Sequence, residues 1–361
     1  MSLWGWRRRG TVLACALLGV VFSPNSAVTK IASPDGCVQP TRRMTMYAVQ
    51  LPDDGEKTRL AYGLTPETAS IPGPTIEMLE GECLAITVVN DIPVDTLQTL
   101  RDDPLEGSQD PAMPLAVSLH VHGVKYTQAS DGTIDTNSYV LPGRSRTYTW
   151  YAAPRATIGG RIVSLGTAGY WWYHDHVVGT SHGTLGVASG LFGALIVRRP
   201  GDLVPSKTFV VGMGPNATLN LRHHPETDCE LGKPMVPSNS CYVATMGERV
   251  EFVVVGFGND FHTFHLHGHT WANNRTGMFT SQADDTALID NKTVGPADSF
   301  GFQIIAGEEV GAGQWMLHCH VQSHSDKGMS TFFHVLRPDG SPAPNASGPI
   351  NLFEHKHYGR P

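Results

Sequence analysis

The sequence predicts an all-β chain folded into two sandwiches or barrels. Glycine and proline are abundant, with 39 and 25 copies in 361 residues, which is typical of many turns between short strands. Runs of β-branched and aromatic residues are short, and no stretch keeps the 3.6-residue hydrophobic period of a helix. At about 150 residues per domain, the length favours two domains.

The expected strands fall into both halves of the chain. They cover residues 84–90, 146–151 and 191–198 in the first half, and 208–212, 250–255, 314–321 and 331–336 in the second. The turn Arg199-Pro200-Gly201-Asp202 is the expected junction. We therefore assign domain 1 to residues 28–200 and domain 2 to residues 201–338. Residues 339–361, rich in Pro, Gly, Ser and Asn, are expected to form a flexible C-terminal tail.

Residues 1–27 are typical of a secretory signal peptide. Arg7, Arg8 and Arg9 precede an apolar run at residues 11–22, and small residues follow near Ser26 and Ala27. The run is shorter than the ~20 residues that a membrane-spanning helix needs. We expect a secreted protein, extracellular or in the cell envelope, with no membrane association after cleavage. The general secretory route and the twin-arginine route both remain open.

Composition narrows the classes of function. Hydrophobic residues make up 40% of the chain and charged residues 16%, so a packed core is expected. The chain has 33 acidic and 26 basic residues, a net charge of −7. This balance argues against nucleic acid as a partner, because binding to phosphates requires a concentrated positive surface.

An odd number of cysteines remains once Cys15 is assigned to the signal peptide. In an exported protein this indicates one thiol with a role other than pairing. Cys319 lies between two histidines and is the candidate metal ligand. By elimination, we expect Cys229 to pair with Cys241, and Cys37 to pair with Cys83.

Four His-X-His pairs repeat in matched positions. The first half contains His120-Val-His122 and His174-Asp-His176, and the second half contains His265-Leu-His267 and His318-Cys-His320. Residues i and i+2 of a strand point to the same face, so each pair forms a two-pronged imidazole clamp. A single pair is weak evidence, but four in matched positions predict metal binding, and imidazole suits copper, zinc, iron and nickel.

Cys319 and two downstream residues favour copper. The strand pleat sends Cys319 to the face opposite His318 and His320. His324 follows Cys319 by five residues, and Met329 follows by another five. A thiolate, two histidines and a weak axial methionine make up a blue-copper site, and zinc seldom recruits methionine.

These motifs resemble the four copper signatures of the multicopper oxidases, from about residue 72 to residue 338. Two domains with the blue site in the second are similar to the two-domain bacterial laccases, also called small laccases. The resemblance implies two cupredoxin-like Greek-key β-sandwich or barrel domains and four coppers: one type 1, one type 2 and a type 3 pair. It assigns type 1 copper to His262, Cys319, His324 and Met329; type 2 to His120 and His265; and type 3 to His122, His174, His176, His267, His318 and His320.

The resemblance also implies a function. A laccase oxidises phenolic and other aromatic donors by one electron at the type 1 copper and reduces O₂ to water at the trinuclear cluster. Tyr126, Asp131 and Asp290 match residues implicated in proton supply there, although Asp131 could equally be a turn residue before Gly132. The family places domain 1 of one subunit against domain 2 of the next. We therefore expect a homotrimer with its clusters at subunit interfaces.

Three other functions compete with this interpretation. A metallo-oxidase acting on Cu(I) or Mn(II) would share every ligand, but such enzymes often carry Met-rich segments, and the 11 methionines here are scattered. A copper nitrite reductase has no type 3 pair and has its blue site in the first domain. A copper carrier without enzymatic activity would need neither a thiolate site nor a cluster. The natural substrate is not encoded in a readable motif.

Overall fold

The computed structural model describes residues 37, 39–52, 57–223, 225 and 240–343. The predicted signal peptide, Cys229 and all but the first residues of the predicted tail lie outside this part. All described residues belong to one unit, Pro34–Pro361. In the described part, no helix has the length and apolar character needed to cross a membrane.

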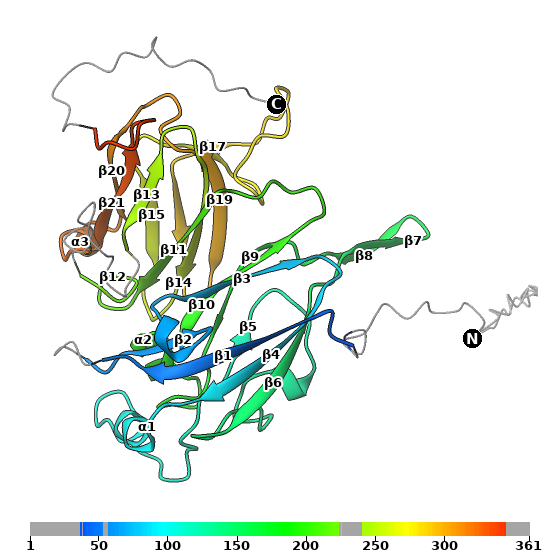
Figure 1. The fold of residues 1–361 in the computed structure, drawn as a ribbon, viewed down its shortest axis with the longest axis vertical. Coiled ribbons are helices and arrows are strands. Elements are labelled where there is room, and N and C mark those ends of the chain that lie inside the picture. The colour runs from blue at the N-terminus through cyan, green and yellow to red at the C-terminus, as the bar shows by residue number, and fades with distance from the viewer. Residues whose placement is uncertain (1–36, 38, 53–56, 224, 226–239, 344–361) are drawn as a thin grey trace, which may run out of the picture. The chain divides into compact units, whose positions relative to one another are not determined.

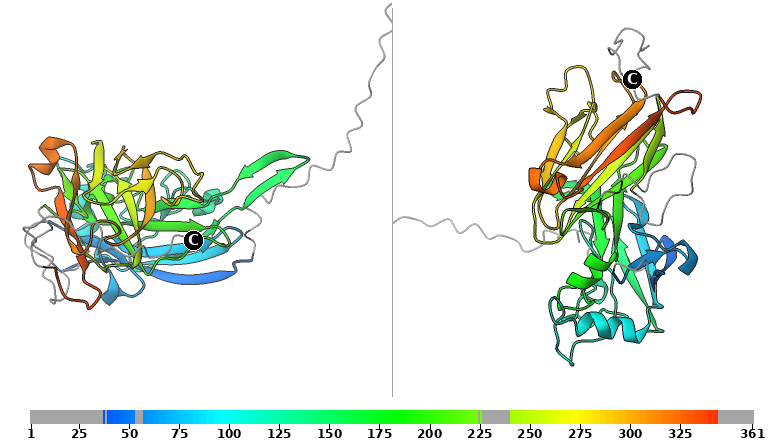
Figure 2. Two further views of the ribbon diagram at one scale, coloured as in Figure 1. Left: turned by 90° about the horizontal axis from the view of Figure 1, so that it is seen from above. Right: turned by 90° about the vertical axis from the view of Figure 1, so that its left-hand side faces the viewer.

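Two sheets are built from strands that precede residue 200 (Figure 1). One has the order β2-β1-β4-β6 and the other has the order β3-β10-β9-β5. A separate β7–β8 hairpin extends away from both (Figures 1 and 2). The strands are β1 (Arg42–Gln50), β2 (Leu60–Gly63), β3 (Gly73–Leu79), β4 (Cys83–Asn90), β5 (His120–Val121), β6 (Ser145–Tyr151), β7 (Arg155–Ile158), β8 (Arg161–Leu165), β9 (Gly169–His174) and β10 (Phe192–Arg198), with helices η2 (Pro66–Thr68), α1 (Val94–Arg101), η3 (Gln128–Ser130) and α2 (Thr184–Ser189).

Strands after residue 200 form two further sheets. Their orders are β12-β11-β14-β19 and β13-β21-β20-β15-β18, and β16 and β17 form a two-stranded sheet. The elements are β11 (Lys207–Gly214), β12 (Thr218–Leu219), β13 (Tyr242–Thr245), β14 (Arg249–Gly256), β15 (His262–Leu266), β16 (Trp271–Ala272), β17 (Leu288–Ile289), β18 (Asn291–Val294), β19 (Ser299–Ile305), β20 (Gly313–Cys319), α3 (Gln322–Ser325) and β21 (Ser330–Leu336).

The two halves share one topology. In the first half β1 runs parallel to β4, which pairs antiparallel with β6; in the second, β11 runs parallel to β14, which pairs antiparallel with β19. The parallel pairs β3–β10 and β13–β21 continue antiparallel into β9 and β20. The predicted all-β fold is confirmed, and every expected strand overlaps an observed one, although the strand expected at residues 314–321 ends at Cys319. The boundary at residue 200 stays a prediction.

Each half has its own apolar core, as alternation along the strands requires. Met46, Tyr148 and Trp150 are fully buried in the first, and Phe252 and Phe302 are fully buried in the second. The predicted Cys37–Cys83 disulfide is present and ties the start of the described chain to β4. The predicted partner of Cys241, Cys229, lies outside the described residues.

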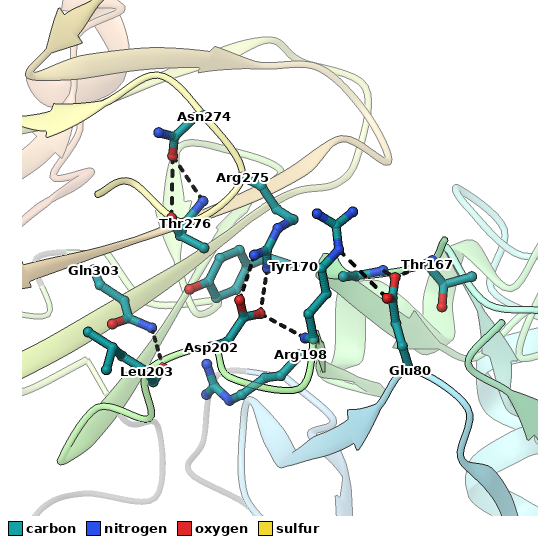
Figure 3. A network of polar contacts seen from close by, with 12 residues as sticks. Glu80, Thr167, Tyr170, Arg198, Asp202, Leu203, Asn274, Arg275, Thr276 and Gln303 are labelled. Atoms are coloured by element: carbon teal, nitrogen blue, oxygen red, sulfur yellow. Dashed lines mark hydrogen bonds and ion pairs between the residues drawn. The ribbon is translucent and has the colours of Figure 1, made fainter. Parts of the chain in front are cut away.

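Polar contacts join the two halves beside the junction. The buried Arg198 of β10 donates to both carboxylate oxygens of Glu251 on β14, at 3.0 and 2.6 Å, and Tyr170 of β9 donates to the same carboxylate. Beyond the junction, Arg275 donates to both oxygens of Asp202 at 2.6 Å (Figure 3). The buried ionic groups are therefore paired, as their removal from water requires.

Candidate metal centre

The first group of histidines is assembled by β5 and β9. His120 stands directly opposite His174 in the antiparallel register. The His120 ring lies 5.2, 5.3 and 5.2 Å, between centroids, from the rings of His122, His174 and His176. One donor atom from each of His120, His122 and His174 lies within 4.8 Å of the others. We call these four histidines the first half-site.

The second group repeats this arrangement on β15 and β20. His265 stands opposite His318. The His265 ring lies 4.9, 5.3 and 5.5 Å from the rings of His267, His318 and His320. His265, His267 and His318 have donor atoms within 4.8 Å of one another. We call these four histidines the second half-site; strand register has brought together both pairs of clamps predicted from the sequence.

Backbone carbonyls orient the imidazoles. Nδ1 of His120 lies 2.6 Å from the carbonyl oxygen of Asp131, and Nδ1 of His265 lies 2.9 Å from that of Asp290. His174 and His318 use the carbonyl of the following residue, at 2.7 and 2.8 Å. Because a carbonyl only accepts, Nδ1 of each ring carries the proton. The unprotonated Nε2 is then free to bind a metal.

Burial favours the neutral form, which binds metal, in several of these rings. Burial, helped by the charges of His120 and His176, lowers the pKa of His122 to about 4. Burial also places the pKa of His174 well below its ordinary value. Nε2 of His122 lies 3.1 Å from Nε2 of His174, and the matching distance between His267 and His318 is 3.2 Å. Such converging nitrogens fit bound copper ions.

A third group contains the sulfur. The Sγ of Cys319 lies 4.0 Å from Nδ1 of His262 and 3.7 Å from Nδ1 of His324, and the two nitrogens are 3.2 Å apart. Met329 is buried, and its carbonyl accepts the N–H of Cys319 at 3.0 Å. Burial raises the pKa of the Cys319 thiol, so a cation is needed to hold it as thiolate. His262, Cys319 and His324 are therefore suited to a soft, positively charged metal, and the predicted axial ligand, Met329, is buried in the same core.

The sulfur site and the second half-site share one strand end. Cys319 is fully buried within the apolar core of the second half, whereas His318 on the same strand joins the histidines of the second half-site. Cys319 is the only free cysteine in the described part of the chain. A covalent path of a few bonds therefore links the sulfur to the rings of His318 and His320.

The two half-sites do not meet within one copy of the chain. Over the residues that the structure describes, no hydrogen bond or ring contact links a histidine of one half-site to a histidine of the other. A cavity of about 660 Å³ opens beside the first half-site. Its lining includes all four histidines, His182, and Phe257 and Ala297 of the second half. Each half-site supplies only half of the eight cluster ligands predicted from the sequence.

The three predicted proton-supply residues lie beside the predicted type 2 ligands. The carboxylate of Asp131 is 3.7 Å from Nδ1 of His120, and that of Asp290 is 3.9 Å from Nδ1 of His265. The ring centroid of Tyr126 is 5.9 Å from that of His120. Partial burial and the Asp131 carboxylate raise the pKa of the Tyr126 phenol. These positions are compatible with the predicted roles in proton supply.

Sequence reasoning missed a glycine–tryptophan contact in each half-site. Gly123 and Gly268, one residue after each first clamp, have φ of +84° and +70°. A Cβ on Gly123 would lie 2.0 Å from the Trp171 ring, and a Cβ on Gly268 would lie 2.6 Å from the Trp315 ring. Only glycine fits at both positions. The signal that could have revealed the contact is Trp-X-X-His, repeated before each second clamp.

His269 is a structural residue. Both of its ring nitrogens have partners: Nδ1 lies 3.1 Å from the carbonyl of His267, and Nε2 accepts the N–H of Gly307 at 3.0 Å. The ring is buried against Trp315 and Phe333. It holds the turn after the second half-site's first clamp and has no free nitrogen for a metal.

Comparisons with known proteins agree with this geometry. The family model for multicopper oxidases matches residues 211–339. A probable nitrite reductase-hydroxylamine oxidoreductase fusion protein of Kuenenia stuttgartiensis is 33% identical over 285 residues, which cover 76% of this chain and 28% of that protein. Human ceruloplasmin is 28% identical over 251 residues, covering 61% of this chain and 21% of that protein. The chain thus spans only about a quarter of the length of these relatives.

Solved structures share the fold. A blue copper oxidase from Nitrosomonas europaea aligns with a TM-score of 0.54 and 21% identity, covering 82% of this chain and 86% of that chain. A copper nitrite reductase from the same organism aligns with a TM-score of 0.54 and 16% identity, covering 86% and 98%. The fold and the three ligand groups define a cupredoxin-type copper protein. Residues 211–339 match the multicopper oxidase family, and this match implies that the bound metal is copper.

Proposed function

We propose that this protein is a laccase-type multicopper oxidase of the two-domain kind. It would oxidise phenolic and related aromatic donors by one electron each and reduce O₂ to water. The observation that carries the proposal is the placement of Cys319 between His318 and His320, with the sulfur in one ligand group and His318 in another. Copper bound there would supply one-electron transfer at the sulfur site and four-electron O₂ reduction at the histidine cluster.

A small organic electron donor could approach the sulfur site from the side of His324 and Phe261. Cys319, His262 and Met329 are buried, whereas His324 is only partly so. Phe261, directly before His262, is 66% exposed. An aromatic donor can stack on such a ring while its oxygen approaches the His324 edge. These features support a small organic donor.

Assembly completes the cluster in this proposal. The second half-site of one subunit would face the cavity at the first half-site of its neighbour, and a head-to-tail arrangement of three copies would close the ring. The separation of the half-sites within one chain supports this arrangement. Light scattering should find a trimer that loses oxygen uptake on dissociation, and an active monomer would refute it.

Asp131, Tyr126 and Asp290 would supply protons to this cluster. The two carboxylates flank His120 and His265, and the Asp131 carboxylate also acts on the Tyr126 phenol. A carboxylate beside a ligand histidine holds the ring in position and can pass on a proton. We also propose that the protein is secreted, by either export route. The support is the predicted signal peptide at residues 1–27, which lies outside the described residues.

Nitrite reduction is the second candidate, because the Kuenenia stuttgartiensis relative is described as a probable nitrite reductase fusion. The four His-X-His pairs argue against it, since a copper nitrite reductase would need no type 3 pair. A metallo-oxidase role toward Cu(I) or Mn(II) shares the ligands but lacks support from a methionine-rich segment.

One experiment on the copper-loaded protein separates these functions. Copper per chain, the visible spectrum and oxygen uptake would be measured with 2,6-dimethoxyphenol, a non-phenolic dye, Cu(I) and Mn(II), together with nitrite consumption. We expect four coppers, a blue band and uptake that is fastest with the methoxyphenol, because an axial methionine still donates to copper and gives a modest potential. Faster oxidation of the dye would refute that ranking. A colourless loaded protein, or nitrite consumption without oxygen uptake, would overturn the proposal.

A further inference from the structure

The two halves correspond residue by residue around their clamps, and Asp175 occupies the place of Cys319. His174-Asp175-His176 pairs with His120 as His318-Cys319-His320 pairs with His265. The N–H of Ser118 donates to Asp175 Oδ1 at 2.7 Å, and the N–H of Thr263 donates to Cys319 Sγ at 3.5 Å. One side chain thus accepts the same backbone N–H in both halves.

Two other predicted ligands of the sulfur site, His262 and Met329, have apolar counterparts in the first half. Val117 stands three residues before His120, as His262 stands before His265. The N–H of Asp175 donates to the carbonyl of Leu191 at 2.9 Å, in the manner of Cys319 and Met329. Val117 and Leu191 are both fully buried and offer no donor atom. The first half therefore lacks two of the ligands of a blue-copper site, and Asp175 serves another purpose.

Its carboxylate anchors the loop that carries the second clamp. Besides Ser118, it accepts the N–H groups of Val177 and Val178 through Oδ2, at 2.9 and 2.7 Å. Asp175 is fully buried, and a Cβ on Gly186 of α2 would lie 2.3 Å from Oδ2. Three backbone donors and the close approach of α2 hold this carboxylate in a single position.

The same contacts reach the ligand rings. The hydroxyl oxygen of Ser118 accepts the N–H of His176 at 2.9 Å, and the carbonyl of Asp175 accepts Nδ1–H of His174 at 2.7 Å. Asp175 and Ser118 together therefore fix both neighbouring ligands: the Asp175 carbonyl orients the His174 ring, and the Ser118 hydroxyl holds the backbone of His176. Metal affinity depends on such outer contacts, which set the angle and spacing of the ligands.

We propose that Asp175 is a positioning residue for the histidine cluster. Its carboxylate replaces the sulfur of the second half and holds His174 and His176 at the spacing that the type 3 copper pair requires. This inference rests on the proposed function only in taking copper as the metal of the cluster. The hydrogen bonds that carry the inference are the three accepted by the Asp175 carboxylate and the one accepted by the Ser118 hydroxyl.

The test compares Asp175→Asn with Glu251→Gln in the full, copper-loaded protein. Asparagine keeps the shape, but whichever way its amide is turned, the NH₂ group would face a backbone N–H, either that of Ser118 or those of Val177 and Val178. Glu251 is an equally buried carboxylate away from the cluster. The readouts are copper per chain, the blue band, and the chelator concentration that removes cluster copper.

For Asp175→Asn we expect cluster copper to be lost at about tenfold lower chelator concentration, with the blue band retained. Glu251→Gln should lower thermal stability without changing the chelator profile. Ser118→Ala, a milder change, should shift the profile in the same direction by less. If Asp175→Asn loses cluster copper at the same chelator concentration as the wild type, the inference is overturned. It is also overturned if Asp175→Asn and Ser118→Ala both lose cluster copper and the blue band together. Failure of the proposed function would be separate, because the wild-type protein itself would then lack the blue band or the four coppers.

Discussion

The two half-sites have the same strand register, the same carbonyl contacts to Nδ1 and the same tryptophan over glycine, yet only the second adjoins a sulfur site. The difference lies at a few positions: Cys319, His262 and Met329 in one half correspond to Asp175, Val117 and Leu191 in the other. The comparison teaches that the clamp geometry is a property of the cupredoxin scaffold. The electron-entry site is added by side chains at positions that the scaffold already provides.

The largest expected effect comes from removing the residue that makes the halves differ. In Cys319→Ser, the hydroxyl is a poor ligand for a soft metal, so the blue band should disappear. Turnover of phenols should fall by about a thousandfold or more, because electrons have no entry. Absorption spectra, copper analysis and oxygen uptake would measure this. Retention of the blue band would show that the comparison assigns the wrong residue to the sulfur site.

A second prediction tests the equivalence of the glycines. Gly123→Ala and Gly268→Ala each place a Cβ at positive φ against a tryptophan ring, at a cost of about 2–4 kcal/mol in unfolding free energy. The cost should be greater at Gly123, because its Cβ would be 2.0 Å from the ring rather than 2.6 Å. The indole N–H of Trp171 also donates a shorter hydrogen bond, 2.7 Å to the carbonyl of Thr167, than that of Trp315, 3.3 Å to the carbonyl of Gly311. Chemical denaturation would rank the two variants, and the reverse order would break the correspondence.

Much of the site could be predicted from the sequence because the alternation of side chains along a strand is a local property. A strand period of two places His120 with His122 and sends Cys319 away from His318, whatever the rest of the fold does. The role of Asp175 could not be read in this way. The N–H of Asp175 donates to the carbonyl of Leu191, sixteen residues later, whereas the N–H of Cys319 donates to the carbonyl of Met329, only ten residues later. Only the folded loop shows that Leu191 corresponds to Met329.

The same limit applies to contacts between distant strands. The repeated Trp-X-X-His spacing was visible in the sequence, but its meaning depends on the pairing of β5 with β9 and of β15 with β20. Likewise, the pairing of Arg198 with Glu251 joins residues 53 positions apart. Charge and burial patterns indicate that a buried arginine needs a partner, but they do not select it.

A third prediction compares the two carboxylates beside the type 2 ligands. Asp131→Asn should slow oxygen reduction about tenfold to a hundredfold while leaving the copper content intact, because the amide cannot pass on a proton. Asp290→Asn should have a smaller effect, since its side chain is 48% exposed against 25% for Asp131, and water can replace it. Oxygen uptake and copper analysis would measure both. A normal rate for Asp131→Asn would remove its proposed role.

The smallest expected effect tests whether the junction beside residue 200 is independent of the metal centre. Burial disfavours ionisation of Asp202, but hydrogen bonds from Arg275 and from the backbone N–H of Arg199 outweigh it and lower the pKa. A lowered folded-state pKa stabilises the fold above the usual range near 4 and loses that contribution as the pH falls. Asp202→Asn should therefore cost about 1 kcal/mol at pH 7 and less near pH 2. Thermal unfolding at both pH values would show this. Copper content and the blue band should not change, because the pair lies beside the junction and neither residue contacts a histidine of either half-site. A change in either would mean that the junction controls the metal centre.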